Sequence, residues 1–424
     1  MSDPVRAAGT DPVRAFGELA AAHERMFWLD GGGARPWSGR RSILGFLRDE
    51  DVSLTYDAGR REVCRHQHGR ADVVGDDVFE VLGRHVAADA GDPRVSWVGY
   101  LGYACRPDLP ARLAGSPVPD AVWMRVRDAV VVTHPVVRDR PGRPRGRRTE
   151  RPSPPAAYAA AFGTVQEQLR AGNSYEVNLT YREQVVSAED PRAVYLRLRA
   201  TNPAPYAGYL RHHGVHLLSS SPERFATIDR HGWLETKPIK GTTPRGETPG
   251  EDERLCRLLA EDPKCRAENL MIVDLLRNDL SMVCEPGSVT VPVLMDVESY
   301  PSVHQLVSTV RGRLRPGVGT VEALRTLFPA GSMTGAPKRR TMQVIADVET
   351  TPRGVYAGAF GLVGADGRAD LGVVIRSLVA TGGAGCWRYE LGTGGGITVR
   401  SDVGEEYAET RWKAERLRGA LRAR

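Results

Sequence analysis

The sequence predicts an α+β fold, on three observations. Short runs rich in valine, leucine and tyrosine are typical of strands, and they follow one another in series. Helical stretches stand between them in separate blocks, and the chain after residue 350 returns to glycine-punctuated strands. Strands in series with separate helix blocks favour an α+β fold over a doubly wound parallel sheet.

The composition is typical of a globular protein rather than of a nucleic-acid-binding protein. Of the 424 residues, 41% are hydrophobic and 26% are charged. The net charge of +6 comes almost wholly from arginine, because only five residues are lysine. The densest basic run, 138–148, is rich in proline and glycine and holds no aromatic residue, which favours a solvated linker over a nucleic-acid arm. We therefore expect no nucleic-acid partner.

The sequence contains no signal for a membrane. No apolar run approaches the roughly 20 residues that cross a bilayer, and the residues after Met1 do not form a secretory signal. The six cysteines are scattered, and no pair has the C-x-x-C spacing of a metal or redox motif. We expect a cytoplasmic protein with reduced cysteines and no membrane partner.

The length predicts two or three domains, and the stretch rich in arginine, proline and glycine is a candidate boundary. We expect an N-terminal region at 1–137, a linker at 138–155 and a larger domain at 156–424. Within the first region, 97–103 alternates aromatic residues with glycine, which is typical of closely packed strands. A second strand is expected at 129–133.

The larger region combines both kinds of element. We expect strands at 175–180, 216–220 and 225–229, and strand-rich stretches at 355–363 and 370–381. Helices are expected at 158–171, 191–200 and 251–281, and from about 404 onwards. Asp262-Pro263 predicts a break in the third helix, because proline disrupts a helix interior.

Acidic side chains in two predicted helices could hold a divalent cation. Glu406 and Glu409 are three residues apart, so they share a helix face and repel one another. Lys413, four residues after Glu409, could compensate that charge. Alternatively, the two carboxylates join Glu268, whose apolar neighbours predict burial, around a cation. A few carboxylates supplemented by water are typical of Mg²⁺.

A second group of residues could bind a carboxylate. The run Gly392–Gly396 has almost no side chains, so its backbone N–H groups could approach an anion closely; the alternative is a plain turn. The run lacks the Lys-Ser/Thr ending of a nucleotide-binding loop. Arg376 ends an apolar run and needs an anionic partner, either a ligand carboxylate or an internal Asp or Glu.

Lys240 and Glu223 are candidate catalytic residues. Lys240 lies in the apolar, turn-flanked segment 237–242 of a chain with few lysines. Burial would lower its pKa and make the amine a neutral nucleophile near pH 7; the alternative is a surface lysine at a strand end. Glu223 could be a general acid if its pKa is raised, and the alternative is a glutamate paired with arginine.

Together these segments resemble the chorismate-utilising enzymes, a family that includes anthranilate, isochorismate, salicylate and aminodeoxychorismate synthases. Seven matching segments occur in family order: 221–225, 237–242, 267–280, 331–338, 353–358, 394–397 and 406–413. Weaker matches in the first region are Trp28-Leu-Asp, Trp37-Ser-Gly and 99–103. The resemblance implies two large, mostly antiparallel sheets packed as a sandwich with helices outside, and 156–424 as the chorismate-binding catalytic domain.

The resemblance also implies roles for individual residues. Glu268 and Glu409, with Glu406 beside them, would hold Mg²⁺ against the ring carboxylate of chorismate. The enolpyruvyl carboxylate would be held by Arg376, Tyr356 and the backbone of Gly392–Gly396, including Gly394, Gly395 and Gly396. The ring site would be lined by Gly241, Thr242 and Ser332.

Lys240 distinguishes between the activities of the family. Anthranilate and isochorismate synthases usually have alanine at this position, whereas lysine is typical of the branch that makes 4-amino-4-deoxychorismate. The implied mechanism is attack of Lys240 on ring C2 while Glu223 protonates the departing C4 hydroxyl; ammonia then adds at C4 and the lysine leaves. Glu176 stands where isochorismate synthases have lysine, and Gln305 where anthranilate synthases have histidine, which counts against both of those activities.

The resemblance implies a protein partner as well. These residues include no glutaminase segment, so we expect ammonia from a separate glutamine amidotransferase subunit, and a product that leads to 4-aminobenzoate for folate or a specialised metabolite. The alternatives are anthranilate synthase component I, isochorismate synthase, and a catalytically silent protein that binds chorismate.

Overall fold

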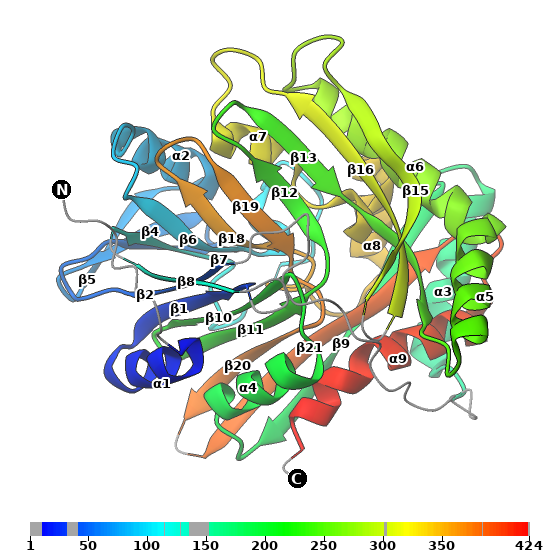
Figure 1. The fold of residues 1–424 in the computed structure, drawn as a ribbon, viewed down its shortest axis with the longest axis horizontal. Coiled ribbons are helices and arrows are strands. Elements are labelled where there is room, and N and C mark those ends of the chain that lie inside the picture. The colour runs from blue at the N-terminus through cyan, green and yellow to red at the C-terminus, as the bar shows by residue number, and fades with distance from the viewer. Residues whose placement is uncertain are drawn as a thin grey trace.

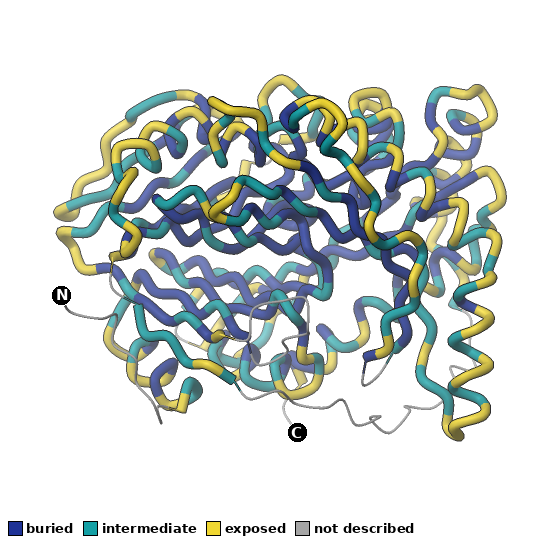
Figure 2. The backbone as a smooth tube through the Cα atoms, turned by 45° about the horizontal axis from the view of Figure 1, so that its top comes forward, coloured by how far each residue is buried: buried dark blue, intermediate teal, exposed yellow. Residues whose placement is uncertain are grey.

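The computed structural model describes residues 11–31, 41–113, 115–127, 129–134, 152–300, 303–383 and 385–422. Within these ranges the chain forms two large antiparallel sheets in layers, with helices on their outer faces (Figures 1 and 2). The predicted α+β class and the predicted two-sheet arrangement are confirmed.

The first sheet has nine strands, in the order β17-β9-β21-β20-β11-β10-β1-β2-β8. Their bounds are β1 Arg25–Asp30, β2 Arg41–Phe46, β8 Val130–Thr133, β9 Glu176–Ser187, β10 Tyr206–His212, β11 Val215–Ser221, β17 Gly335–Ala336, β20 Ser377–Gly383 and β21 Cys386–Ile397. Neighbouring strands pair antiparallel throughout, and β21 lies along β9 over its whole length after Cys386.

The second sheet has twelve strands, in the order β14-β16-β13-β12-β19-β18-β6-β7-β3-β4-β5, with β15 paired to β16. Their bounds are β3 Ser53–Asp57, β4 Glu62–Gln67, β5 Arg70–Gly75, β6 Ser96–Leu101, β7 Ala121–Val126, β12 Arg224–Ile228, β13 Trp233–Lys237, β14 Ile239–Pro244, β15 Thr290–Ser299, β16 Val303–Arg313, β18 Ala359–Gly364 and β19 Ala369–Val373. Strands from before and after the predicted linker occur in both sheets. The proposed domain division stays a prediction, because most of 138–155 lies outside the described residues.

Apolar side chains from the two sheets pack against each other in the middle of the sandwich. Phe27 and Leu210 come from the first sheet, and Tyr100 and Phe360 come from the second. All four are nearly inaccessible to solvent. A large apolar side chain buried in this way stabilises the fold by about 1.5–3 kcal/mol. The two sheets therefore share an apolar core, which fixes their positions relative to each other.

Nine helices are found among the described residues: α1 Pro12–Ala22, α2 Val78–Ala88, α3 Ala156–Arg170, α4 Pro191–Thr201, α5 Pro249–Glu261, α6 Pro263–Ser281, α7 Thr320–Leu327, α8 Lys338–Val348 and α9 Val403–Ala420. Helices α1, α4 and α9 cover the first sheet, and α2, α6 and α7 cover the second. The predicted helix break is confirmed: Asp262 ends α5 and caps α6 by accepting a hydrogen bond from the Cys265 N–H at 2.7 Å. No described helix combines the length and apolar character needed to cross a membrane.

The stretch predicted to be strand-rich at 370–381 is divided by a sharp turn. It forms β19 and β20, and Arg376 between them adopts a φ of 51°. A left-handed conformation costs a residue with a side chain on the order of 1–3 kcal/mol, and it persists where packing enforces it, often at functional sites. The turn directs Arg376 away from the strand path, which the run of apolar residues alone did not indicate.

Candidate active site

Most of the predicted site residues line one cavity. It encloses about 830 Å³, part of it open to solvent, and is bounded by β14, β21, α6 and α9. The predicted residues in its wall are Lys240, Glu223, Arg376, Tyr356, Gly241, Thr242, Ser332, Gly394, Gly395, Gly396, Glu268 and Glu409. Glu406, also predicted for the site, is not part of the wall. Segments more than 180 residues apart in sequence therefore meet here, as the family order of the motifs implied.

Lys240 lies on β14 and is only 7% exposed, so the alternative of a surface lysine is excluded. Its Nζ forms an ion pair with the Oε1 of Glu176, the first residue of β9. Burial acts to lower the pKa of Lys240, but the carboxylates of Glu176, Glu268 and Glu223 together raise it above the ordinary value. The expected neutral amine is therefore wrong for the resting protein, because a partner distant in sequence keeps the ammonium charged.

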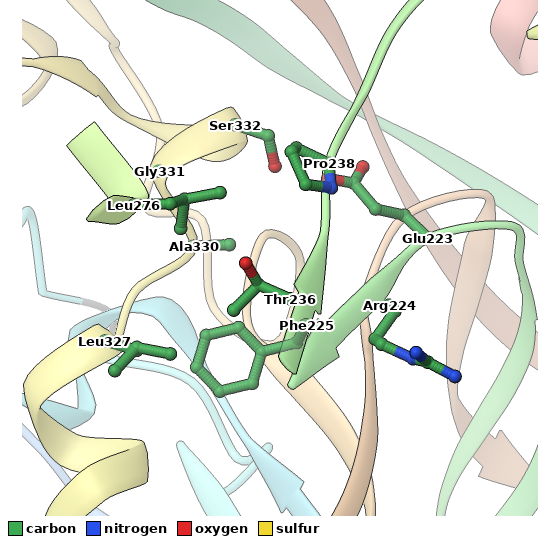
Figure 3. Close-up of a pocket in the computed structure, with 10 residues that line it drawn as sticks. All are labelled: Glu223, Arg224, Phe225, Thr236, Pro238, Leu276, Leu327, Ala330, Gly331 and Ser332. Carbon is green, nitrogen blue, oxygen red and sulfur yellow. The ribbon is translucent and has the colours of Figure 1, made fainter. Parts of the chain in front are cut away.

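Glu223 lies between β11 and β12 and is 5% exposed. A smaller cavity shares Glu223 and Ser332 with the main one, and its wall is otherwise largely apolar, with Phe225 and Leu276 (Figure 3). Burial raises the pKa of Glu223 to about 7, although the Ser332 hydroxyl and the Lys240 charge favour the carboxylate. The condition for a general acid, a raised pKa, is thus met at this residue.

Glu268 lies on α6 and is also buried. Its Oε1 accepts no hydrogen bond from any described residue, and Lys264 on the preceding turn lies 3.9 Å from it. Burial raises the pKa of Glu268. An unsatisfied buried carboxylate is costly, so this oxygen is suited to a cation supplied from outside the chain.

The two glutamates of α9 have different surroundings. The Glu409 side chain is 49% exposed and pairs with Lys413 at 2.7 Å, which is the compensation that the spacing allowed. Glu406 is buried, and its Oε1 binds Lys264 at 2.5 Å and Ser401 at 2.6 Å. Among the described residues, no three His, Cys, Asp or Glu side chains are grouped closely enough to hold a metal. The protein alone therefore offers Glu268 and Glu409 to the cavity, with Glu406 already neutralised.

The glycine run belongs to a strand, in contrast to the turn considered from the sequence. Residues 386–391 of β21 pair with β20, and beyond Leu391 the described chain pairs β21 with β9 alone. The Gly394 carbonyl accepts a hydrogen bond from Lys413 at 3.0 Å, so it points away from β9. Because N–H and C=O of one residue point to the same side of an antiparallel strand, every second amide of the run faces this unpaired edge in the cavity wall.

Arg376 and Tyr356 complete that side of the cavity. Arg376 has no carboxylate within ion-pair distance among the described residues, and its guanidinium lies 5.8 Å from the centre of the Trp412 ring. Burial, assisted by the charge of Arg416, lowers the pKa of Arg376 to about 10. The Tyr356 ring fills the space at Gly392, where a Cβ would lie 2.2 Å from it. An arginine left without an internal anion is suited to a ligand carboxylate.

No binding or catalytic role was predicted for several other polar residues in or near the wall. Asn178 of β9 donates to the Ser332 carbonyl at 2.7 Å and has a buried Oδ1 without a donor. Gln305 also lines the cavity with an unpaired Oε1, whereas the adjacent His304 turns away to Asp252. Lys264 was overlooked, although its place four residues before Glu268 in a chain with five lysines was a usable signal.

Comparisons with known proteins identify relatives along the whole chain. A family model described as chorismate binding enzyme matches residues 46–419. Proteins named aminodeoxychorismate synthase from Streptomyces pristinaespiralis and Streptomyces griseus are 39% and 43% identical over 97% and 96% of this chain. The chain covers 64% and 62% of those relatives, less than two thirds of their length. The solved structure of anthranilate synthase component I from Streptococcus pneumoniae aligns over 100% of both chains, with a TM-score of 0.73 and 25% identity.

Proposed function

The chain belongs to the chorismate-binding enzymes, and we propose that it replaces the C4 hydroxyl of chorismate with an amino group to give 4-amino-4-deoxychorismate. One observation carries this proposal: a buried lysine, Lys240, lines the same cavity as Glu223, an acid whose pKa is about 7. Nucleophile and general acid are thus available to the same substrate. The two Streptomyces relatives named aminodeoxychorismate synthase support this assignment.

Chorismate carries two carboxylates, and the cavity offers a means of binding each. We assign the enolpyruvyl carboxylate to Arg376, Tyr356 and the unpaired edge of β21. Among the described residues the guanidinium has no carboxylate within ion-pair distance, and every second amide of the run lacks a strand partner. We assign the ring to the space lined by Gly241, Thr242 and Ser332. A bidentate arginine–carboxylate contact would fix the orientation of the substrate.

We propose Mg²⁺ as the counterion of the ring carboxylate. The residues fit this ion, because no described residue donates a hydrogen bond to Oε1 of Glu268, and Glu409 lines the same cavity. Two carboxylates whose coordination is completed by water and a ligand oxygen are typical of Mg²⁺. When bound, the ion would neutralise the ring carboxylate and stabilise charge in the conjugated system. Glu406 would remain beside them, paired with Lys264.

The side chains then perform two displacements. Lys240 Nζ bonds to ring C2, the ring double bonds shift, and the C4–O bond breaks while the Glu223 proton moves to the oxygen, which leaves as water. Ammonia adds at C4, the double bonds return, and the C2–N bond to Lys240 breaks. The enolpyruvyl group is retained, because no step removes a proton from a ring carbon next to the one that carries it.

We propose that the ammonia comes from a separate glutamine amidotransferase subunit. The structural relative is named component I, which supports a second component in that protein. The product would be the precursor of 4-aminobenzoate, for folate or a specialised metabolite. The cytoplasmic location stays a prediction.

Anthranilate synthase component I is the second candidate, favoured by the structural relative that aligns over the full chain. Its reaction ends with loss of pyruvate, for which a histidine would be expected in the cavity. Here Gln305 lines the cavity and His304 binds Asp252 at 3.0 Å. That arrangement favours retention of the pyruvyl group.

Incubation of the purified protein with chorismate, Mg²⁺ and ammonium chloride tests the assignment. We expect 4-amino-4-deoxychorismate by mass spectrometry, with 4-aminobenzoate and pyruvate only after a lyase is added. Immediate release of pyruvate with fluorescent anthranilate would refute the proposal in favour of the second candidate. Isochorismate as the product would instead identify an isochorismate synthase. Chorismate that binds but is not converted would indicate a catalytically silent binding protein.

A further inference from the structure

Glu176 has no role in the reaction steps above, although it is the ion-pair partner of Lys240. It is 1% exposed at the start of β9 and is not part of the cavity wall. Its Oε1 holds the Lys240 ammonium, and its Oε2 is buried without a hydrogen-bond donor among the described residues. Because no other donor in the described ranges shares this carboxylate, its hydrogen bonding is directed at the Lys240 amine.

The neighbouring strands are shaped to hold Glu176 in this position. A Cβ on Gly396 of β21 would lie 2.1 Å from Oε1 of Glu176 and 3.2 Å from Nζ of Lys240. On the other side, a Cβ on Gly335 of β17 would lie 1.9 Å from the Glu176 carbonyl oxygen. Glycine at 396 thus leaves room for the ion pair, and glycine at 335 lets β17 lie against the start of β9, which indicates a built contact rather than an incidental one.

We propose that Glu176 is a positioning residue that holds Lys240 and exchanges one proton with it in each turnover. The inference rests on the proposed amination. Nζ gives a proton to Glu176, and the lone pair so freed forms the C2–N bond. When that bond later breaks, its electron pair returns to Nζ and Glu176 gives the proton back. Each cycle restores both groups, so no further reactant is needed.

The other charged groups around Lys240 are committed elsewhere. Glu223, between β11 and β12, must donate its own proton to the departing hydroxyl. The positive charge of Lys413 on α9 acts to lower the pKa of Glu223. Glu268 of α6 faces the cavity and is assigned to the cation. Of the three carboxylates whose charges act on Lys240, Glu176 is therefore the one available to accept its proton.

Trace acetylation of the intact protein without chorismate tests the ion pair. Acetic anhydride reacts with neutral amines, and peptide mass spectrometry reports Lys240 relative to the four other lysines. At pH 8 we expect Glu176→Gln to raise the relative labelling of Lys240 by at least about tenfold. A tenfold rise in the neutral amine corresponds to a fall of about one unit in the pKa of Lys240. Glu390→Gln is the matched control, because Glu390 hydrogen-bonds Gln184 at 3.2 Å further along the same two strands. Equal labelling of Lys240 in the Glu176→Gln variant and the unmodified protein would overturn the proposal.

Steady-state amination tests the proton exchange. Glu176→Gln should lower kcat by about a hundredfold or more, with KM for chorismate nearly unchanged because Glu176 is not in the cavity wall. Glu176→Asp should recover part of kcat. Gly396→Ala adds a methyl group on β21 that displaces the Glu176 carboxylate, so this variant should show the same increase in the labelling of Lys240. Full kcat in a folded Glu176→Gln variant would refute the exchange. If the unmodified protein does not aminate chorismate, the proposed function fails, and the labelling ratio still decides the ion pair.

Discussion

Between pH 6 and pH 8, the rate of amination should fall because Glu223 loses the proton that it must donate. Its carboxyl lies against an apolar wall, and burial raises its pKa to about 7. An acid with this pKa is roughly nine-tenths protonated at pH 6 and roughly one-tenth at pH 8, so kcat should decline about tenfold. The sign follows from the role: the protonated form is active, and it disappears as the pH rises through the pKa.

The assay must keep ammonia from dominating the pH dependence. We would measure kcat at saturating chorismate and Mg²⁺, with total ammonium adjusted so that neutral ammonia is constant at each pH. Glu223→Gln should lower kcat by about 10²- to 10⁴-fold and remove the decline, whereas Glu223→Asp should keep a decline at a shifted pH. A flat profile in the unmodified protein, or the same decline in Glu223→Gln, would refute the acid role.

Four further outcomes are expected. Lys240→Ala should abolish amination while calorimetry still detects chorismate binding, and full activity would refute the nucleophile. Arg376→Lys should raise KM for chorismate about tenfold or more, because a charged bidentate contact is lost; an unchanged KM would reassign the enolpyruvyl site. Gly392→Ala should lower the free energy of unfolding in urea by about 1–3 kcal/mol, since its Cβ would lie 2.2 Å from the Tyr356 ring; wild-type stability would contradict that packing. EDTA should stop turnover and excess Mg²⁺ restore it, whereas a rate unaffected by chelation would exclude the metal.

Local sequence signals were sufficient where a structure depends on neighbouring residues. The break at Asp262-Pro263 was predictable, because proline and the capping aspartate act within one turn. The class of the fold followed similarly from runs of strand-like residues. The pairing order of the sheets was not predictable, because β9 joins β21 and β17 from far along the chain.

The protonation state of Lys240 could not be predicted from its local sequence. Burial of the lysine could be predicted from its apolar segment, and burial alone lowers the pKa of an amine. The deciding partner, Glu176, precedes it by 64 residues and reaches it only through the space left at Gly396. For the glycine run, a plain turn was one of the two alternatives, since glycine is typical of turns. In the structure the run is part of a strand, and its glycines leave space for Tyr356 and Glu176.

The unpaired edge of β21 also bears on how the protein remains separate from other chains. A row of unpaired amides and carbonyls at the edge of a sheet can pair with a strand of another chain and so promote aggregation. Proteins usually prevent this pairing with charged residues or proline at the edge. In this protein the unpaired stretch beyond Leu391 lines the cavity, with α9 and Lys413 alongside it. Hydrogen-bonding capacity that would promote fibrils on the outer surface is thus kept for a small ligand.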